Sequence, residues 1–274
     1  MTYREAYDKG RKSIVSDEAD TEAALLLEHV MNTERGDLFA HPDRILSDDE
    51  EKTYFGLIER RNTGEPVQYI TGKTYLYGLE FFCDRSVLIP RFDTEVLIEE
   101  TIKKAPKDSE LLDLCTGSGC IALCVKHERE DITVSASDIS KDALNVAKKN
   151  SENLGLKINL IHSDLFSNID DRFDIIVSNP PYIPTNVIRG LDEKVKDFEP
   201  EGALDGGEDG LDFYRIIAKE AVRFLKGESF LIMEIGYDQG ESVSGILSEN
   251  GYKDIKVIKD LNGLDRVVTA VYER

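Results

Sequence analysis

The stretch LLDLCTGSGCIA, residues 111–122, decides the fold of this 274-residue chain. Its first residues have the pattern of a short buried strand, its middle is a glycine turn, and its last residues begin an apolar helix. Glycines at 117 and 119 let the backbone come close to a ligand, and the start of a helix offers unpaired N–H donors. The stretch therefore indicates an α/β fold with a ligand site at the carboxyl end of the strand.

A second strand pattern covers residues 133–137 and leads directly to an acidic residue. This residue, Asp138, follows the glycines by about 20 positions, where doubly wound folds place an acid on ribose hydroxyls. The spacing predicts a cofactor that carries a nucleoside. The alternative is that Asp138 only helps to cap the helix that starts after Ser140.

A third strand pattern, residues 157–161, leads to Asp164, Leu165 and Phe166. Asp164 would lie at the same edge of the sheet and could accept a hydrogen bond from an adenine amino group, while the two apolar side chains cover the ring. The turn has Ala122 at the third glycine of the G-x-G-x-x-G dinucleotide pattern, and the chain has no G-x-x-x-x-G-K-[ST] phosphate loop. S-adenosylmethionine, which has a ribose and an adenine but no phosphate, suits this pattern.

A fourth apolar run, residues 173–177, ends in Ser178-Asn179-Pro180-Pro181-Tyr182. Neither proline can donate to a sheet ladder, so a stiff loop follows the strand. The side-chain oxygen of Asn179 and the carbonyl of Pro180 could each accept one hydrogen of a substrate NH2 group, while Tyr182 packs on the planar group that carries it. The loop predicts chemistry on a flat amine or amide nitrogen. The alternative is a proline turn that only closes a strand.

The glycine turn, the two acids and the Asn-Pro-Pro-Tyr loop, in this order, resemble an S-adenosylmethionine-dependent methyltransferase of the seven-strand class. Together with the first 85 residues, further stretches narrow the resemblance to the HemK/PrmC family of protein-glutamine methyltransferases, which modify peptide chain release factors. These stretches are residues 65–72 (EPVQYITG), 77–81 (YGLEF), 87–95 (VLIPRFDTE), 199–200 (EP), 203–207 (ALDGG) and 209–211 (DGL). The resemblance covers nearly the whole chain.

The resemblance implies a site with two parts. The catalytic residues are Asn179, Pro180 and Tyr182, and together with Pro181 they also bind the substrate. The residues expected to bind the cofactor are Asp113, Cys115, Thr116, Gly117, Ser118, Gly119, Asp138, Asp164, Leu165 and Asn179. The sequence departs from the family pattern in two places, where Phe92 replaces the usual proline and Cys115 the usual glycine.

The expected reaction is in-line methyl transfer to the N5 amide nitrogen of the glutamine in the Gly-Gly-Gln loop of a release factor. Two other classes of function remain open. One is methylation of adenine or guanine amino groups in nucleic acid, which uses the same Asn-Pro-Pro-Tyr chemistry. The other is a domain that binds the cofactor or a partner without catalysis.

The charge of the chain bears on the first of these alternatives. With 34 basic and 54 acidic residues, the net charge is −20. Proteins that bind nucleic acid usually carry a basic face, because the release of counterions drives that binding. The composition therefore favours a protein substrate, and we expect no direct contact with nucleic acid.

Composition also bears on location and on metals. The first residues are charged and lack an apolar leader, and no apolar run approaches the roughly 18 residues of a membrane span. The four cysteines follow no disulfide pattern, which suits a reducing compartment. Cys120, Cys124 and His127 have a spacing that places them on one helix face, but core packing of the cysteines is favoured over a metal site. We expect a cytoplasmic protein, monomeric and without a metal.

The apolar patterns predict how the chain is divided. Residues 1–72 are expected to form a small helical domain that binds the protein substrate, residues 73–86 a hairpin linker that turns at Gly78, and residues 87–274 the catalytic domain. The catalytic domain should contain seven strands, the last antiparallel. Its strands are expected near 110–114, 133–137, 157–161, 174–178, 229–235, 255–258 and 266–272, with helices near 120–128, 141–152, 211–225 and 239–250.

Overall fold

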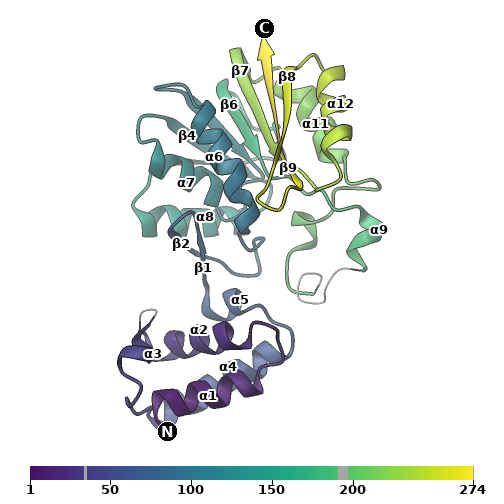
Figure 1. Cartoon of the computed structure of the whole chain (residues 1–274). Coiled ribbons are helices and arrows are strands. Elements are labelled where there is room, and N and C mark those ends of the chain that lie inside the picture. Colours follow the sequence, from purple (N-terminus) through teal and green to yellow (C-terminus); the bar gives the residue numbers. More distant parts are fainter. Residues whose placement is uncertain (34–35, 191–196, 274) are drawn as a thin grey trace. The chain divides into compact units, whose positions relative to one another are not determined.

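The computed structural model describes residues 1–33, 36–190 and 197–273 (Figure 1). This part of the chain forms two compact units. The smaller unit contains residues 1–73 with 197–198, and the larger one contains residues 74–190 and 199–273.

The smaller unit is helical. Its helices are α1 (Tyr3–Ser13), α2 (Ala19–Met31), α3 (Asp37–Ala40), α4 (Asp48–Asn62) and α5 (Val67–Thr71). Capping boxes begin two of them, with Thr2 and Glu5 at α1 and Ser47 and Glu50 at α4. The predicted helical character of the first part of the chain is confirmed.

The core of this unit surrounds Tyr54, which is fully buried and donates its hydroxyl to the carbonyl of Ala23 at 3.2 Å. Gly10 must be glycine, because a Cβ there would lie 1.9 Å from the Tyr54 hydroxyl. Arg61 and Glu22 form a buried ion pair at 2.7 Å beside this core. Such a pair selects one packing of the helices, since either charge would be costly to bury alone.

The larger unit contains a seven-stranded sheet in the order β5-β4-β3-β6-β7-β9-β8. The strands are β3 (Glu110–Leu114), β4 (Thr133–Asp138), β5 (Asn159–His162), β6 (Phe173–Ser178), β7 (Leu225–Glu234), β8 (Lys253–Lys259) and β9 (Asp265–Glu273). All pairs are parallel except those that β9 makes with β7 and β8. The predicted α/β fold with seven strands and an antiparallel last strand is confirmed.

Helices cover both faces of this sheet (Figure 1). On one face lie α6 (Glu95–Lys104), α7 (Cys120–Glu128) and α8 (Lys141–Leu154), and on the other lie α11 (Asp212–Ala221) and α12 (Gly240–Glu249). Leu111 and Leu112 of β3 belong to opposite apolar clusters because successive strand residues point to opposite faces. The predictions missed α6 and the short helices η1 (Phe92–Thr94), α9 (Thr185–Ile188) and η2 (Glu201–Ala203).

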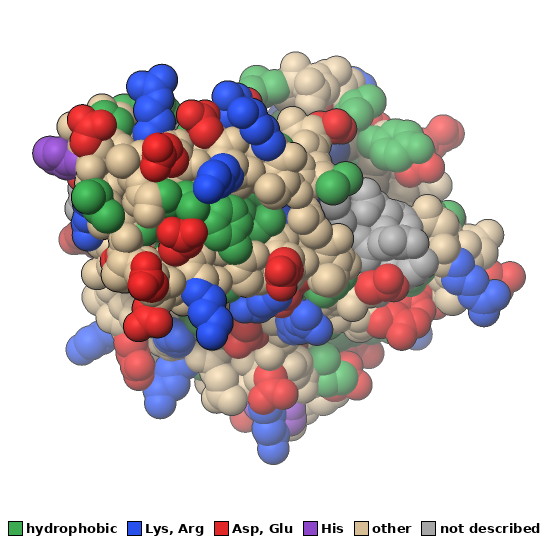
Figure 2. Space-filling model, turned by 90° about the horizontal axis from the view of Figure 1, so that it is seen from below, with side chains coloured by type: hydrophobic (Ala, Val, Ile, Leu, Met, Phe, Trp, Pro, Cys, Tyr) green, Lys and Arg blue, Asp and Glu red, His purple; other side chains and the backbone are tan. Residues whose placement is uncertain are grey.

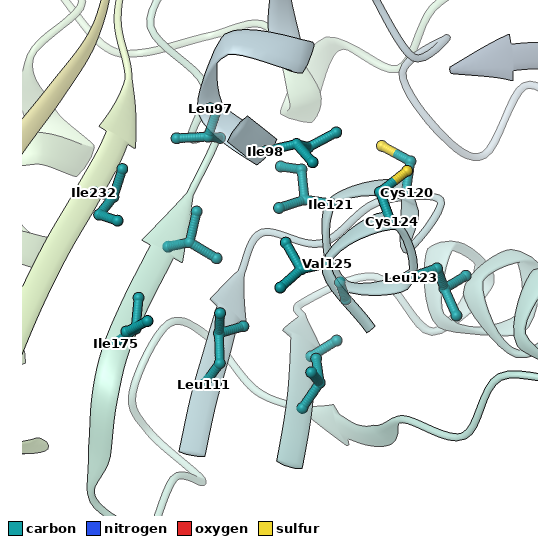
Figure 3. Close-up of a cluster of buried hydrophobic side chains, with 14 of the residues drawn as sticks. Leu97, Ile98, Leu111, Cys120, Ile121, Leu123, Cys124, Val125, Ile175 and Ile232 are labelled. Carbon is teal, nitrogen blue, oxygen red and sulfur yellow. The ribbon is translucent and has the colours of Figure 1, made fainter. Parts of the chain in front are cut away.

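The cysteines of α7 belong to the apolar cluster on the first face (Figure 3). Cys120 and Cys124 are buried there, whereas His127 of the same helix is exposed. The packing prediction for the two cysteines is confirmed. Within the residues described, no helix combines the length and apolar character needed to cross a membrane.

The predicted hairpin is also present. It consists of β1 (Lys73–Leu76) and β2 (Leu79–Phe82), and Tyr77 and Gly78 between them both have positive φ, as a two-residue type I′ turn requires. From Thr74 onward the hairpin belongs to the larger unit. The boundaries proposed at residues 72 and 86 stay predictions.

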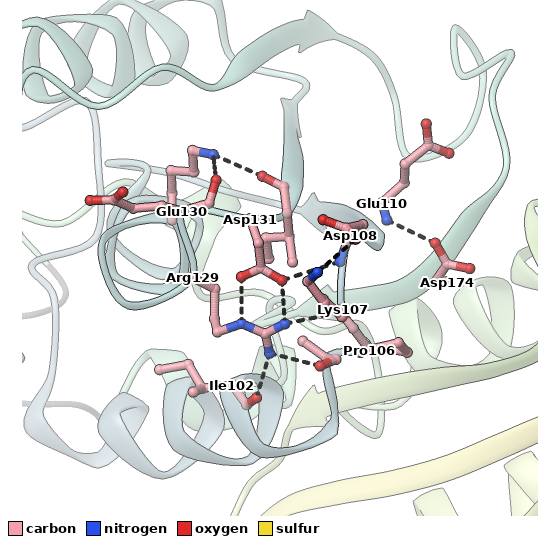
Figure 4. Close-up of polar contacts among 12 residues, drawn as sticks. Ile102, Pro106, Lys107, Asp108, Glu110, Arg129, Glu130, Asp131 and Asp174 are labelled. Carbon is pink, nitrogen blue, oxygen red and sulfur yellow. Dashed lines mark hydrogen bonds and ion pairs between the residues drawn. The ribbon is translucent and has the colours of Figure 1, made fainter.

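Arg129, just after α7, forms hydrogen bonds to the loops that precede β3 and β4 (Figure 4). Its guanidinium donates to the carbonyls of Ala105 at 2.7 Å and Pro106 at 3.0 Å, and it forms a two-bond pair with Asp131 at 2.7 and 2.8 Å. These contacts satisfy carbonyls at the end of α6, which the helix itself leaves unpaired. This network lies at the opposite edge of the sheet from the glycine turn.

Candidate active site

Positive φ angles shape the glycine turn after β3. Gly117 and Gly119 have φ of 54° and 79°. A Cβ on Gly119 would lie 3.0 Å from the Cβ of Ala147, so glycine also permits the close approach of α8. Cys115, at the start of the turn, has φ of 58° although it carries a side chain. The family glycine that it replaces would meet no such steric cost.

Asp113 supports this turn from inside the protein. It is fully buried, and its Oδ2 accepts hydrogen bonds from the Thr116 hydroxyl at 2.6 Å and the Ala122 amide at 3.3 Å. Burial raises the pKa of the carboxyl to about 7. Asp113 does not line the cavity described below, so its place suits a support for the turn rather than a contact to a ligand.

Asp138 joins the turn to the next helix. Its Oδ2 accepts from the Gly117 amide at 2.8 Å and its Oδ1 from the Ser140 amide at 2.9 Å. The helix cap itself is Ser140, whose hydroxyl accepts from the Ala143 amide at 3.2 Å. Each Asp138 oxygen has a second lone pair, so the carboxylate can bind these amides and still accept hydroxyl groups.

Asp164 and Leu165 follow β5 at the same edge of the sheet. Leu165 has φ of 42°, and the Ser163 hydroxyl holds this bend by donating to its carbonyl at 2.7 Å. Both residues line the cavity. The expectation that Phe166 also covers the ligand is wrong, because its side chain is buried in the core and stacks on Phe224 with 4.8 Å between ring centroids.

The Asn-Pro-Pro-Tyr loop leaves the sheet from the end of β6. Ser178 anchors its start by donating its hydroxyl to the carbonyl of Leu114 at 2.8 Å, which joins the ends of β6 and β3. Gln239 holds its other end by donating to the Tyr182 carbonyl at 3.0 Å. Burial raises the pKa of the Tyr182 hydroxyl to about 12, so this group stays neutral.

A glycine-containing segment, residues 203–211, packs along this loop. Ile183 pairs with it through hydrogen bonds to Leu204 and from Gly206, at 3.0 and 2.9 Å. A Cβ on Gly206 would lie 2.7 Å from the Cα of Tyr182, and one on Gly210 would lie 2.4 Å from the Tyr182 carbonyl oxygen. Glycine at these two positions lets the segment hold the loop by direct backbone contact.

The glycine turn, the bend at Asp164 and Leu165 and the Asn-Pro-Pro-Tyr loop contribute to the wall of a cavity of about 440 Å³. Of the residues predicted for the site, Cys115, Thr116, Gly117, Ser118, Asp138, Asp164, Leu165, Asn179 and Pro181 line it. Asp113, Gly119, Pro180 and Tyr182 are not among its lining residues. The predicted residues that line the cavity thus come together from the ends of β3, β4, β5 and β6.

Other parts of the wall were not predicted as site residues. They are residues 86–88, Pro90, Arg91 and Thr94 before α6, Pro200, Gly202, Ala203 and Asp205 around η2, and Phe213 of α11, together with Cys120, Ile121, Ser137, Ile139, Ser140, Ala143 and Ser163 next to the predicted residues. Arg91 pairs with the buried Glu199, which connects the first two of these segments. The segments before α6 and around η2 contain stretches on which the family resemblance rests, and these stretches could have indicated the wall of the site. Nothing in their local sequence pattern indicated a ligand.

Comparisons with known proteins agree with this geometry. Residues 9–72 match the PrmC N-terminal domain family, and residues 91–189 match the methyltransferase small domain family. A release factor glutamine methyltransferase of Koribacter versatilis is 41% identical over 277 residues, which cover 98% of both chains. The chain belongs to the release factor glutamine methyltransferase family.

A second member of the release factor glutamine methyltransferase family, from Geobacter sulfurreducens, is 41% identical over 251 residues, covering 91% of this chain and 88% of that protein. Among solved structures, a methyltransferase from Pyrococcus furiosus matches with a TM-score of 0.55 and 15% identity, covering 72% of this chain and 90% of that one. At 15% identity, the structural match supports only the assignment of the fold.

Proposed function

We propose that this chain transfers a methyl group from S-adenosylmethionine to the side-chain amide nitrogen of the glutamine in the Gly-Gly-Gln motif of peptide chain release factors. One observation carries the proposal beyond family membership. Asp138, Asp164 and Asn179, from three different strand ends, line the same cavity. This supports adjacent sites for a nucleoside and for the amide that is methylated.

The residues of the cavity fit the cofactor. Its volume of about 440 Å³ lies in the usual range for small-molecule sites. We assign the ribose hydroxyls to Asp138, the adenine amino group to Asp164 and the methionine portion to the glycine turn. Gly117, with no neighbour within 4 Å of a Cβ built on it, leaves the turn open on that side. When bound, S-adenosylmethionine supplies a methyl group on a positively charged sulfur.

Asn179 and Pro180 prepare the amide for reaction. An amide nitrogen is a weak nucleophile because its lone pair is delocalised into the carbonyl, with a rotation barrier of about 18–20 kcal/mol in a peptide bond. If the oxygens of Asn179 and Pro180 each accept one N–H, the nitrogen can become pyramidal, and both oxygens stabilise the positive charge that develops on it. Holding the two reactants in line contributes on the order of 7–11 kcal/mol.

A protein substrate remains favoured over nucleic acid. The net charge of −20 opposes binding to phosphates. Basic and acidic side chains are interspersed over the face that Figure 2 shows. We assign the binding of the release factor to the small helical unit. We propose that the enzyme acts as a monomer in the cytoplasm. The four free cysteines agree with this reducing compartment.

The test is transfer of labelled methyl groups to three acceptors: an intact release factor, the same factor with the Gly-Gly-Gln glutamine changed, and a mixture of DNA and RNA. We expect label on the intact factor alone. Label on nucleic acid, or on both forms of the factor, would contradict the proposal.

Asn179→Ala adds a test of the catalytic loop. We expect a rate loss of about 100-fold or more, as for the removal of other preorganised polar groups, with the cofactor affinity largely unchanged. Asn186→Ala, which changes an exposed side chain of α9 a few residues after the loop, is the matched control and should retain the wild-type rate. If Asn179→Ala weakens cofactor binding as much as it slows transfer, Asn179 holds the cofactor rather than the amide.

A further inference from the structure

Glu234 is a buried carboxylate beside the catalytic loop, and the mechanism above does not use it. It is the last residue of β7 and is 2% exposed. In the parallel pairing of β6 and β7, Ser178 lies opposite Met233, so the next residues of the two strands are Asn179 and Glu234. Met233 belongs to the cluster under α11 and α12, and alternation directs Glu234 to the other face of the sheet.

The surroundings of Glu234 bear on its charge. Burial raises the pKa of its carboxyl, while the nearby polar side chains of Thr94 and Asn179 lower it and so favour the ionised form. Its Oε2 has no hydrogen-bond partner among the described residues. A buried carboxylate with an unpaired oxygen is costly, and such groups collect at functional sites.

Charged and titratable groups face Glu234 from five further places in the sequence. Arg266 of β9 lowers its pKa and Asp93 before α6 raises it. Its charge in turn raises the pKa values of Tyr182, of Tyr214 in α11 and of Cys120 in α7. Burial is the main cause of the raised pKa values of these three groups, which stay neutral near pH 7.

We infer that Glu234 is a positioning residue that sets the orientation of the Asn179 side-chain amide. By accepting a hydrogen from the Asn179 Nδ2, the carboxylate turns the Oδ1 toward the cavity, where it can accept an N–H of the substrate. The opposite orientation would present Nδ2, a donor, to a substrate nitrogen whose hydrogens need acceptors. The inference rests on the proposed function, because it deepens the role of Asn179.

This arrangement makes the orientation depend on pH. Burial raises the pKa of the Glu234 carboxyl to about 7. Above this pH the carboxylate accepts from Nδ2. Below it, the protonated carboxyl can donate to the Oδ1, and the amide is free to turn over. The rate of methyl transfer should therefore rise through pH 7 and reach a plateau above it.

The first experiment measures kcat and cofactor affinity in the full chain. Glu234→Ala should lower kcat by about 10- to 100-fold, the range seen when residues that orient metal ligands are removed. Glu234→Gln, whose side-chain oxygen can still accept from Nδ2, should recover most of the plateau rate and lose the rise through pH 7. Glu228→Gln, which changes an exposed residue in the first half of β7, is the matched control and should keep the wild-type plateau rate and the rise through pH 7.

A second experiment needs no turnover and therefore separates this inference from the proposed function. The side-chain amide resonance of Asn179, assigned by its loss in Asn179→Ala, should shift with pH around 7 in the wild type and stay constant in Glu234→Gln. A wild-type rate in Glu234→Ala, an unchanged pH profile in Glu234→Gln, or an Asn179 resonance that ignores pH would each overturn the inference. A failure of the wild type to methylate a release factor, with the resonance shifting as expected, would overturn only the proposed function.

Discussion

At the scale of single residues, Cys115 stands out because it occupies a backbone conformation that suits glycine. Its φ of 58° lies in the left-handed region. There, the contact between Cβ and the following carbonyl oxygen costs about 1–2 kcal/mol. Cys115 nevertheless lines the cavity. Its burial raises the pKa, so the group stays a neutral thiol.

This strain predicts an order of stability at position 115. A β-branched side chain is the least compatible with positive φ, and glycine the most. We expect Cys115→Val to be less stable than Cys115→Gly by about 1–2 kcal/mol in urea unfolding. Equal stability of the two variants would mean that the surrounding turn relaxes at no cost.

Asp138 gives a prediction for cofactor binding. Its carboxylate is assigned to the ribose hydroxyls, and hydrogen bonds to charged groups contribute about 1.5–3 kcal/mol. We therefore expect Asp138→Ala to weaken the cofactor affinity, measured by calorimetry, by about 10- to 100-fold. Asp142→Ala, which changes an exposed acid in the first turn of α8, should leave it unchanged. Unchanged affinity in Asp138→Ala would reduce Asp138 to a partner of the Gly117 and Ser140 amides.

At the scale of secondary-structure elements, Asn150 joins three segments. This buried residue of α8 accepts from the Phe82 amide at 2.7 Å and donates to the carbonyls of Phe82 and Ser118 at 3.0 and 2.9 Å. One side chain thus attaches the hairpin strand β2 to α8 and to the glycine turn. The packing of these elements is coupled through it.

The loss of this side chain should be costly. Asn150→Ala leaves the Phe82 amide and two carbonyls without these partners, and an unsatisfied buried polar group costs about 1–3 kcal/mol. We expect a destabilisation within or above this range in urea unfolding, together with a weaker cofactor affinity. Asn153→Ala, on the exposed side of the same helix, is the control. A small effect on stability would indicate that water replaces the amide.

Elements with a strong local pattern were the ones that sequence could predict. The short apolar runs of β3, β4 and β6 and the hairpin turn at Gly78 follow from composition and period, so their positions were close to those observed. Helix α6 was missed because its sequence, EVLIEETIKK, continues a family stretch that was interpreted as a motif. The place of β9 between β7 and β8 depends on packing that no local pattern encodes.

The candidate site was predictable to the same extent. Acids and glycines that directly follow strands could be assigned, because parallel strands end at one edge of a sheet. Asn150 and Glu234 could not, since their partners are 68 and 55 positions away in the sequence, Phe82 for the first and Asn179 for the second. Long-range neighbours of this kind become visible only when the strand order and register are known.

At the scale of the whole molecule, two buried carboxyls connect stability to pH. Burial raises the pKa of Asp113 and of Glu234 to about 7, compared with about 3.9 and 4.3 for the free side chains. Between these values, the folded protein holds protons that the unfolded chain has already released. Their contribution to stability is complete near pH 4 and is lost as the pH rises through 7.

We therefore expect the free energy of unfolding to decrease between about pH 5 and pH 8. The net charge of −20 adds repulsion in the same direction, and salt should screen that part but not the part from buried groups. Urea unfolding at several pH values, at low and high salt, separates the two. Asp113→Asn should make the curve shallower at high salt, because only the contribution of the other buried carboxyls, such as Glu234, remains. A curve that high salt flattens completely in the wild type would contradict a role of the buried carboxyls.

The strand order also constrains how the protein is made. During synthesis β8 emerges before β9, yet β8 pairs in the sheet only with β9. Until β9 is available, the outer edge of β7 is an open row of backbone donors and acceptors, and such edges attract other chains. We therefore expect a nascent chain that folds before β9 is available to expose this sheet edge, and the pairing of β9 with β7 then covers it.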